Sequence, residues 1–156
     1  MNNDTPTDTE SDIEPPRRPD QRVFEALEQM GVTHDIDKDT GNFLVLVEFK
    51  DGRTQQVFIR SATTEFMGVE MRTISSVALI NQGPFDTRTA NFLLRDNANV
   101  SFGSWQVEVD QERTHYAIFS MTVSASLRAE SLVDLLGMVA RIADTTEERL
   151  SGLDEF

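Results

Sequence analysis

The spacing of apolar residues changes abruptly near residue 42, and this change limits the chain to a fold that mixes helices with strands. Before it, Val23 and Leu27 share the apolar stripe of an amphipathic helix. Residues 42–50 read Asn-Phe-Leu-Val-Leu-Val-Glu-Phe-Lys, a strand that is apolar on both faces. Asp51-Gly52 follows and is typical of a two-residue type I′ turn. We therefore predict a hairpin whose second strand covers residues 54–60.

The rest of the chain predicts one α+β domain with a largely antiparallel sheet. Asp20 caps the first helix and Gly31 ends it. A third strand is predicted within 69–80, followed by a helix at 87–98 that Asp86 caps. One face of this helix carries Ala90, Leu93, Leu94 and Asn97. The remaining predicted elements are a strand at 100–109 with a bulge at Gly103, a strand at 114–123, and a helix from after Leu127 to about Leu150. The predicted order is helix, three strands, helix, two strands, helix, with the strands grouped in hairpins.

The ends of the chain differ from its middle. With 156 residues the sequence has room for one domain. Residues 1–19 are rich in acids and proline and contain almost no large apolar side chains, so we expect a disordered acidic tail there. The domain is predicted to span residues 20–150, and residues 151–156 to fray.

The charge of the chain argues against several kinds of partner. It holds 27 acidic and 14 basic residues, for a net charge of -13, whereas nucleic acids and anionic membranes select basic surfaces. The absence of cysteine excludes disulfides and thiol catalysis. No signal sequence and no apolar run of about 20 residues is present, so a cytoplasmic protein is expected.

Candidate catalytic and metal-binding residues are few. The carboxylates at 35, 37 and 39 have calcium-loop spacing, but Thr40 stands where such a loop needs glycine, and a polar hairpin loop is the better interpretation. The two histidines, His34 and His115, lie in no recognisable catalytic motif. No glycine-rich nucleotide motif is present. We therefore predict no catalytic, cofactor or metal site, and no enzymatic activity.

The apolar surface is more informative than the polar motifs. A strand that is apolar on both faces needs a second cover, and this points to Leu44 and Leu46. Phe92 falls off the centre of its helix stripe, and Trp105 lies beyond the expected bulge. These four residues are the predicted interface for a second subunit or a bound peptide. The alternative is that they all lie in an ordinary monomer core.

Three segments carry a resemblance to a known family. They are Asn-Phe-Leu-Leu-Arg-Asp-Asn at 91–97, Phe-Gly-Ser-Trp-Gln-Val at 102–107 and Leu-Arg-Ala-Glu-Ser-Leu at 127–132. With the element order, they make residues 20–148 resemble the YbjN-like family, which shares its fold with the type III secretion chaperones. The resemblance implies a small acidic cytoplasmic dimer that holds an extended segment of another protein. The acidic tail and the excess of arginine over lysine depart from those chaperones.

The expected function is therefore non-catalytic binding of a protein or peptide segment by a chaperone-like homodimer. Main-chain hydrogen bonds and apolar pockets would hold the segment extended. One alternative is a regulatory module, for signalling or transcription, with a single defined partner. A second alternative is an enzyme whose site the sequence does not reveal.

Overall fold

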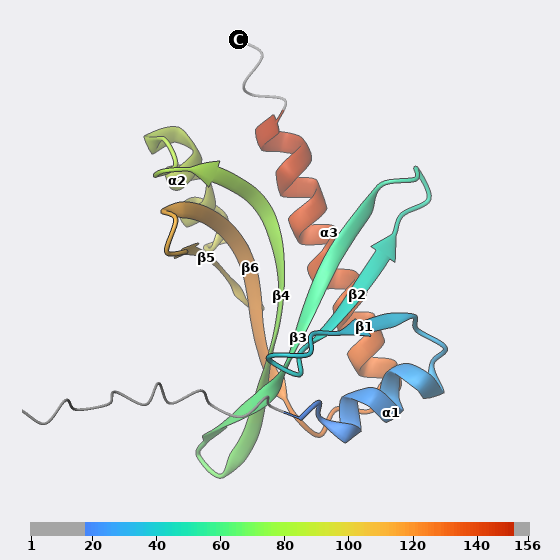
Figure 1. The fold of residues 1–156 in the computed structure, drawn as a ribbon. Coiled ribbons are helices and arrows are strands. Elements are labelled where there is room, and N and C mark those ends of the chain that lie inside the picture. The colour runs from blue at the N-terminus through green and yellow to red at the C-terminus, as the bar shows by residue number, and fades with distance from the viewer. Residues whose placement is uncertain (1–17, 152–156) are drawn as a thin grey trace, which may run out of the picture.

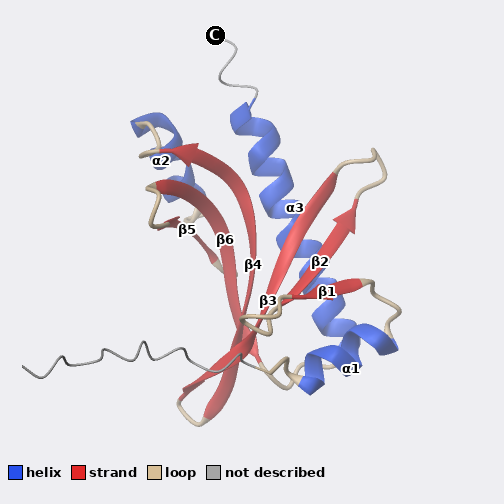
Figure 2. Ribbon diagram, in the orientation of Figure 1, coloured by secondary structure: helices blue, strands red, loops and turns tan. Residues whose placement is uncertain are grey.

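The computed structural model describes residues 18–151, which form three helices and a six-stranded sheet (Figures 1 and 2). The elements are α1 (Gln21–Gln29), β1 (His34–Ile36), β2 (Phe43–Glu48), β3 (Thr54–Phe66), β4 (Val69–Gln82), α2 (Thr87–Asp96), β5 (Ser104–Val109), β6 (Thr114–Ser124) and α3 (Ala129–Ser151). The strand order is β1-β2-β3-β4-β6-β5, and every neighbouring pair is antiparallel. The predicted α+β single domain is confirmed.

Four strands, not three, precede α2. The additional strand is β1, which pairs with the start of β2. The loop between them is the polar hairpin loop expected for this segment, because the Asp37 carboxylate accepts hydrogen bonds from the Asp39 and Thr40 backbone N–H groups. The expectations for residues 1–17 and 152–156 lie outside the described residues, and Ser151 still belongs to α3.

The helices form where capping and periodicity predict them. The Asp20 side chain accepts a hydrogen bond from the Arg22 N–H at the start of α1, and Asp86 accepts one from the Thr89 N–H at the start of α2. Along α3, the buried residues recur every three or four positions from Leu132 to Leu150. One expectation for α2 is wrong, because Leu94 is exposed and only Leu93 is buried.

The core lies between one face of the sheet and the two helices α1 and α3 (Figure 1). Strands β2, β3 and β4 contribute alternate side chains to it, as the two-residue period of a strand predicts. The largest fully buried side chains are Phe43, Phe119, Leu27, Ile59, Ile74 and Leu136. The opposite face of the sheet carries no helix of residues 18–151 (Figure 2).

The type I′ turn lies at a different hairpin from the one for which it was predicted. A type I′ turn needs positive φ at both central residues, and Met67 and Gly68 satisfy this at the β3–β4 turn with φ of 51° and 78°. At the β2–β3 turn only Gly52 has positive φ, and the Phe49 N–H donates to the Arg53 carbonyl around three turn residues. The hairpin at Asp51-Gly52 is confirmed, but its predicted type I′ turn is wrong.

Gly103 is not a bulge inside a strand, because β5 begins one residue later and pairs with β6 without a register shift. The glycine has φ of 80° at a point where the chain passes very close to β6. A Cβ there would lie 2.6 Å from the Ser120 carbonyl oxygen. The bulges lie in β3 and β4 instead, between Ile59 and Thr63 and between Val77 and Leu79.

A buried ion pair between Asp20, which caps α1, and Arg72 on the central strand β4 connects α1 to the sheet. Arg72 on β4 is 3% exposed, and its guanidinium donates to the Asp20 carboxylate at 2.6 Å and to the Arg60 carbonyl at 2.5 Å. Arg22 bridges Asp20 and Glu70 from outside. Hydrogen bonds from Arg22 and then Arg72 hold the pKa of Asp20 far below its usual range, and Arg22 lowers the pKa of Glu70 to about 2.

Candidate functional site

At one end the sheet separates into two parts, one that contains β2 and β3 and one that contains β4 and β6. The pairing of β3 with β4 stops at Phe58 and Ser75, although β3 continues to pair with β2, and β4 with β6. Residues 54–57 and 78–82 therefore diverge, and α3 is visible behind the opening in Figure 1. We call this opening the fork.

Side chains, not a backbone ladder, connect the two parts of the sheet where they separate. The buried Gln55 amide donates to the Ser76 hydroxyl at 2.9 Å and to the Val77 carbonyl at 2.6 Å. The Ser76 hydroxyl donates in turn to the Gln56 carbonyl at 2.6 Å. Beyond these hydrogen bonds, residues 54–57 of β3 and 78–82 of β4 form no backbone pairing with each other.

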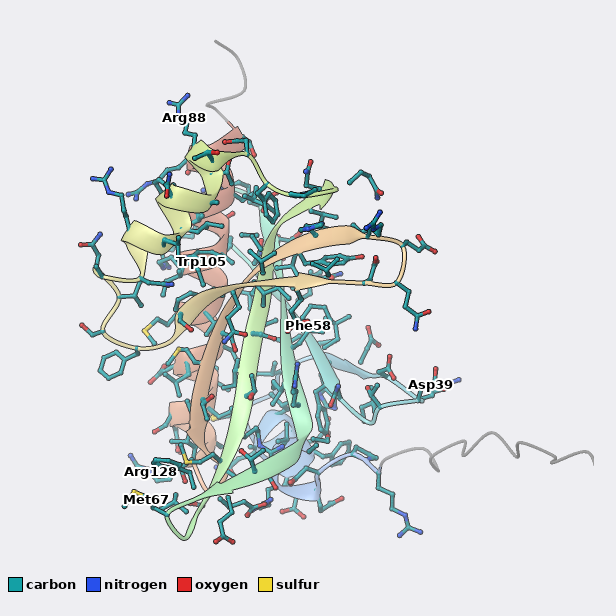
Figure 3. The ribbon with its side chains drawn as sticks, turned by 90° about the vertical axis from the view of Figure 1, so that its left-hand side faces the viewer. Asp39, Phe58, Met67, Arg88, Trp105 and Arg128 are labelled. Atoms are coloured by element: carbon teal, nitrogen blue, oxygen red, sulfur yellow. The ribbon has the colours of Figure 1, made fainter. Side chains whose placement is uncertain are left out.

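The fork contains a cavity of about 700 Å³. Its side walls carry Leu46, Phe58, Ile80 and Tyr116, and its floor includes Glu147 of α3. Leu46 is 59% exposed and Ile80 is 65% exposed, which is high for large apolar side chains. Figure 3 shows Phe58 on the side of the sheet that faces away from α3. The fork thus combines apolar walls with strand edges that face one another unpaired.

The titratable groups around the fork are few and separate. Partial removal from water raises the pKa of the Glu147 carboxyl, and the negative charge of Asp144 raises it further. The Tyr116 hydroxyl donates to Asp110 at 2.9 Å, and this bond raises the pKa of the phenol. The described lining of the cavity holds one carboxyl and no histidine. This composition suits holding an apolar segment better than acid–base chemistry.

Both histidines lie away from the fork cavity. The His34 ring packs between Phe24 and Phe43, with ring centroids 5.6 Å from each. His115 packs edge-on against Phe85. Each histidine places Nδ1 3.0 Å from a backbone carbonyl, and neither has a hydroxyl or carboxylate partner among the hydrogen bonds of residues 18–151.

Three further features of the described residues bear on function. No group of three His, Asp or Glu side chains in residues 18–151 is arranged to hold a metal ion. In the same part of the chain, every buried side-chain nitrogen or oxygen has a hydrogen-bond partner. None of the helices described is long and apolar enough to cross a membrane.

The four residues predicted as an interface do not form one surface. Leu44 and Leu46 lie on the uncovered face of β2, half-buried and exposed respectively. Trp105 is inside the domain, where its indole N–H donates to the Asp96 carboxylate at 2.9 Å and its ring packs on Phe119 (Figure 3). Phe92 is half-buried and lines a separate groove between α2 and α3.

Sequence reasoning identified Leu46 and missed the other three wall residues of the fork. Phe58, Ile80 and Tyr116 belong to three different strands, and only the pairing register brings them beside Leu46. The apolar residues of 43–49 gave the one available signal, since they predicted an uncovered face. Comparison of the chain with protein-family models and with curated proteins finds no match to either.

Proposed function

We propose that this protein is a non-catalytic binding module that holds an extended segment of a partner protein in the fork. The observation that carries the proposal is the divergence of β3 and β4 around a cavity whose side walls expose large apolar side chains. An extended segment can add to an unpaired strand edge through main-chain hydrogen bonds while its alternate side chains enter apolar pockets. The segment would cover Leu46 and Ile80.

The chemistry of the chain supports this function in two ways. Hydrogen bonds to the backbone do not depend on the side chains of the bound segment, so such a site can bind segments of different sequence. The net charge of -13 keeps a complex that carries an unfolded segment soluble. The resemblance to the YbjN-like family and to the type III secretion chaperones agrees with a holding function and suggests the same fold.

The test uses binding to an unfolded probe, reduced and alkylated α-lactalbumin, followed by light scattering or fluorescence anisotropy. Leu46→Asp and Ile80→Asp place a charge on the cavity wall and should each weaken binding about tenfold or more. Phe66→Asp is the matched control, since Phe66 is equally exposed but lies at the far end of β3. Equal effects of all three substitutions, or no binding by the unsubstituted protein, would refute the holding function.

Hydrogen exchange gives an independent check of the binding mode. Strand addition should slow the amide exchange of residues 54–57 or 78–82 when the probe is present. Protection elsewhere, with these amides unchanged, would place the client outside the fork.

We also propose that the protein is a homodimer joined along β5. This strand is one of the two outer strands of the sheet, and Val107 and Val109 on it are about half exposed. An exposed apolar edge strand readily pairs with its own copy about a two-fold axis. Light scattering of the full chain should give the mass of a dimer, and Val109→Lys should give a folded monomer. A monomeric native protein would exclude the dimer.

A further inference from the structure

A second surface lies between α2 and α3, away from the fork. Two cavities of about 590 and 470 Å³ share Asp96, Asn99 and Arg149 in their linings and so form one continuous groove. Figure 3 shows α2 beside the upper part of α3, with Arg88 at the end of α2 that begins the helix. We call this surface the arginine groove.

Helical spacing places the groove residues in two facing rows. On α2, Arg88, Phe92 and Arg95 are four and then three residues apart, so they share one face. On α3, Ile142 and Arg149 are seven residues apart and also share a face. The groove therefore has apolar side chains along its length and an arginine at several points of its rim.

The arginines that line this groove form no ion pair within residues 18–151. They are Arg88, Arg95, Arg141 and Arg149, whereas Arg22, Arg53, Arg60 and Arg72 each form at least one ion pair. The Arg141 guanidinium lies over the Phe49 ring, and Asp86 is a charged neighbour of Arg88. The one carboxylate in the lining is Asp96, and it accepts the hydrogen bond from the Trp105 indole. A chain with a net charge of -13 thus keeps one local patch of positive charge.

We propose that the arginine groove binds a short acidic segment of a partner protein that also carries apolar side chains. Guanidinium groups bind carboxylates through paired, charge-assisted hydrogen bonds. Phe102, at one side of the groove, is 65% exposed and offers a contact for an apolar residue of that segment.

A nucleic acid fits the groove less well than an acidic peptide. Nucleic-acid affinity comes from many phosphate contacts, and this groove supplies four arginines without an ion pair in residues 18–151, on a strongly acidic protein. A peptide segment with two or three carboxylates can pair with those arginines. It also brings less negative charge near the acidic surface of the protein than a nucleic acid would.

The experiment measures anisotropy of a fluorescein-labelled ten-residue peptide of alternating Glu and Leu on the full chain, at low and at high salt. The peptide should bind at low salt and weaken as salt rises. Arg88→Ala and Arg149→Ala should each reduce affinity about tenfold, as expected for loss of a charge-assisted hydrogen bond. Arg128→Ala is the matched control, since Arg128 is exposed and lies near the opposite end of α3 (Figure 3).

Each other outcome would overturn the proposal. Tighter binding of a single-stranded oligonucleotide of equal charge would assign the groove to nucleic acid. A groove blocked by a second copy of the chain would appear as a dimer that Phe92→Asp dissociates. Unchanged affinity in Arg88→Ala and Arg149→Ala would place the peptide elsewhere. Ile80→Asp, which tests the fork, should leave peptide binding intact, so the two proposals can fail separately.

Discussion

Arginine serves two different purposes at the two ends of this molecule. Near α1, Arg72 is buried and donates to Asp20 and to two backbone carbonyls. Beside α2, Arg88 and Arg95 line an open groove and form no ion pair within residues 18–151. The same side chain is thus a fixed part of the fold at one end and an available group at the other. Sequence alone does not distinguish these roles, because both depend on which carboxylates the fold brings near.

The largest effect should come from breaking the buried pair. Asp20→Ala leaves the Arg72 guanidinium buried without its counter-charge and removes the cap of α1, so we expect a loss of about 4 kcal/mol in unfolding free energy. Urea denaturation measures it. Asp20→Asn, which keeps a capping oxygen, should lose less. A loss below about 1 kcal/mol for Asp20→Ala would mean that the pair is not structural.

The same pair should make stability depend on acidity. The pKa of Asp20 is lower in the folded than in the unfolded state, so its stabilising effect is complete above the unfolded value of about 4 and is lost as the pH falls below it. Glu70, whose pKa is lowered to about 2, loses its contact with Arg22 over the same range. Urea unfolding between pH 5 and pH 2 should show a smaller slope in Asp20→Asn than in the native protein.

An intermediate effect is expected at Arg53, which connects the β2–β3 turn to Asp144 and Glu148 of α3 at 3.2 Å each. The Arg53 side chain is partly exposed, so solvent weakens these pairs. The Asp144 carboxylate is buried and would lose its counter-charge, so Arg53→Ala should cost about 1–2 kcal/mol in unfolding free energy. If Arg53→Ala lost as much unfolding free energy as Asp20→Ala, partly exposed arginine pairs would be as important to stability as the buried pair.

The smallest effect on stability should come from the groove. Arg88→Ala, Arg95→Ala and Arg149→Ala should each change the unfolding free energy by no more than about 0.5 kcal/mol, because these side chains hold no ion pair within the described residues. Thermal melts of the three variants check this. If these variants lowered the melting temperature as much as Asp20→Ala does, the groove arginines would be structural like Arg72, and the contrast between the two groups of arginines would be wrong.

The helices could be predicted because periodicity and caps act locally. Asp20 and Asp86 cap the helices that they were expected to cap. β1 was missed because it has three residues and a polar surrounding, so its pairing with β2 is the main reason that it is a strand. The β3–β4 turn was missed because Met67 is not a typical turn residue, although Gly68 is.

The candidate site could be predicted only in part. Leu44 and Leu46 follow from an apolar run that one covered face cannot satisfy. The place of Trp105 in the core depends on Asn97 and Asp96, which bind its backbone and indole N–H groups from the end of α2. The fork itself depends on where the pairing of two long strands stops, and no local pattern encodes that point.

The Met67–Gly68 turn also bears on the order in which the protein folds. It joins β3 and β4 through two residues, so the β3–β4 hairpin closes a very short loop, whereas pairing of β4 with β6 must enclose residues 83–113. The lower entropic cost should let the β3–β4 hairpin form early and serve as the template on which β6 and α3 assemble. Gly68→Ala should then slow refolding more than it speeds unfolding, as stopped-flow measurements would show.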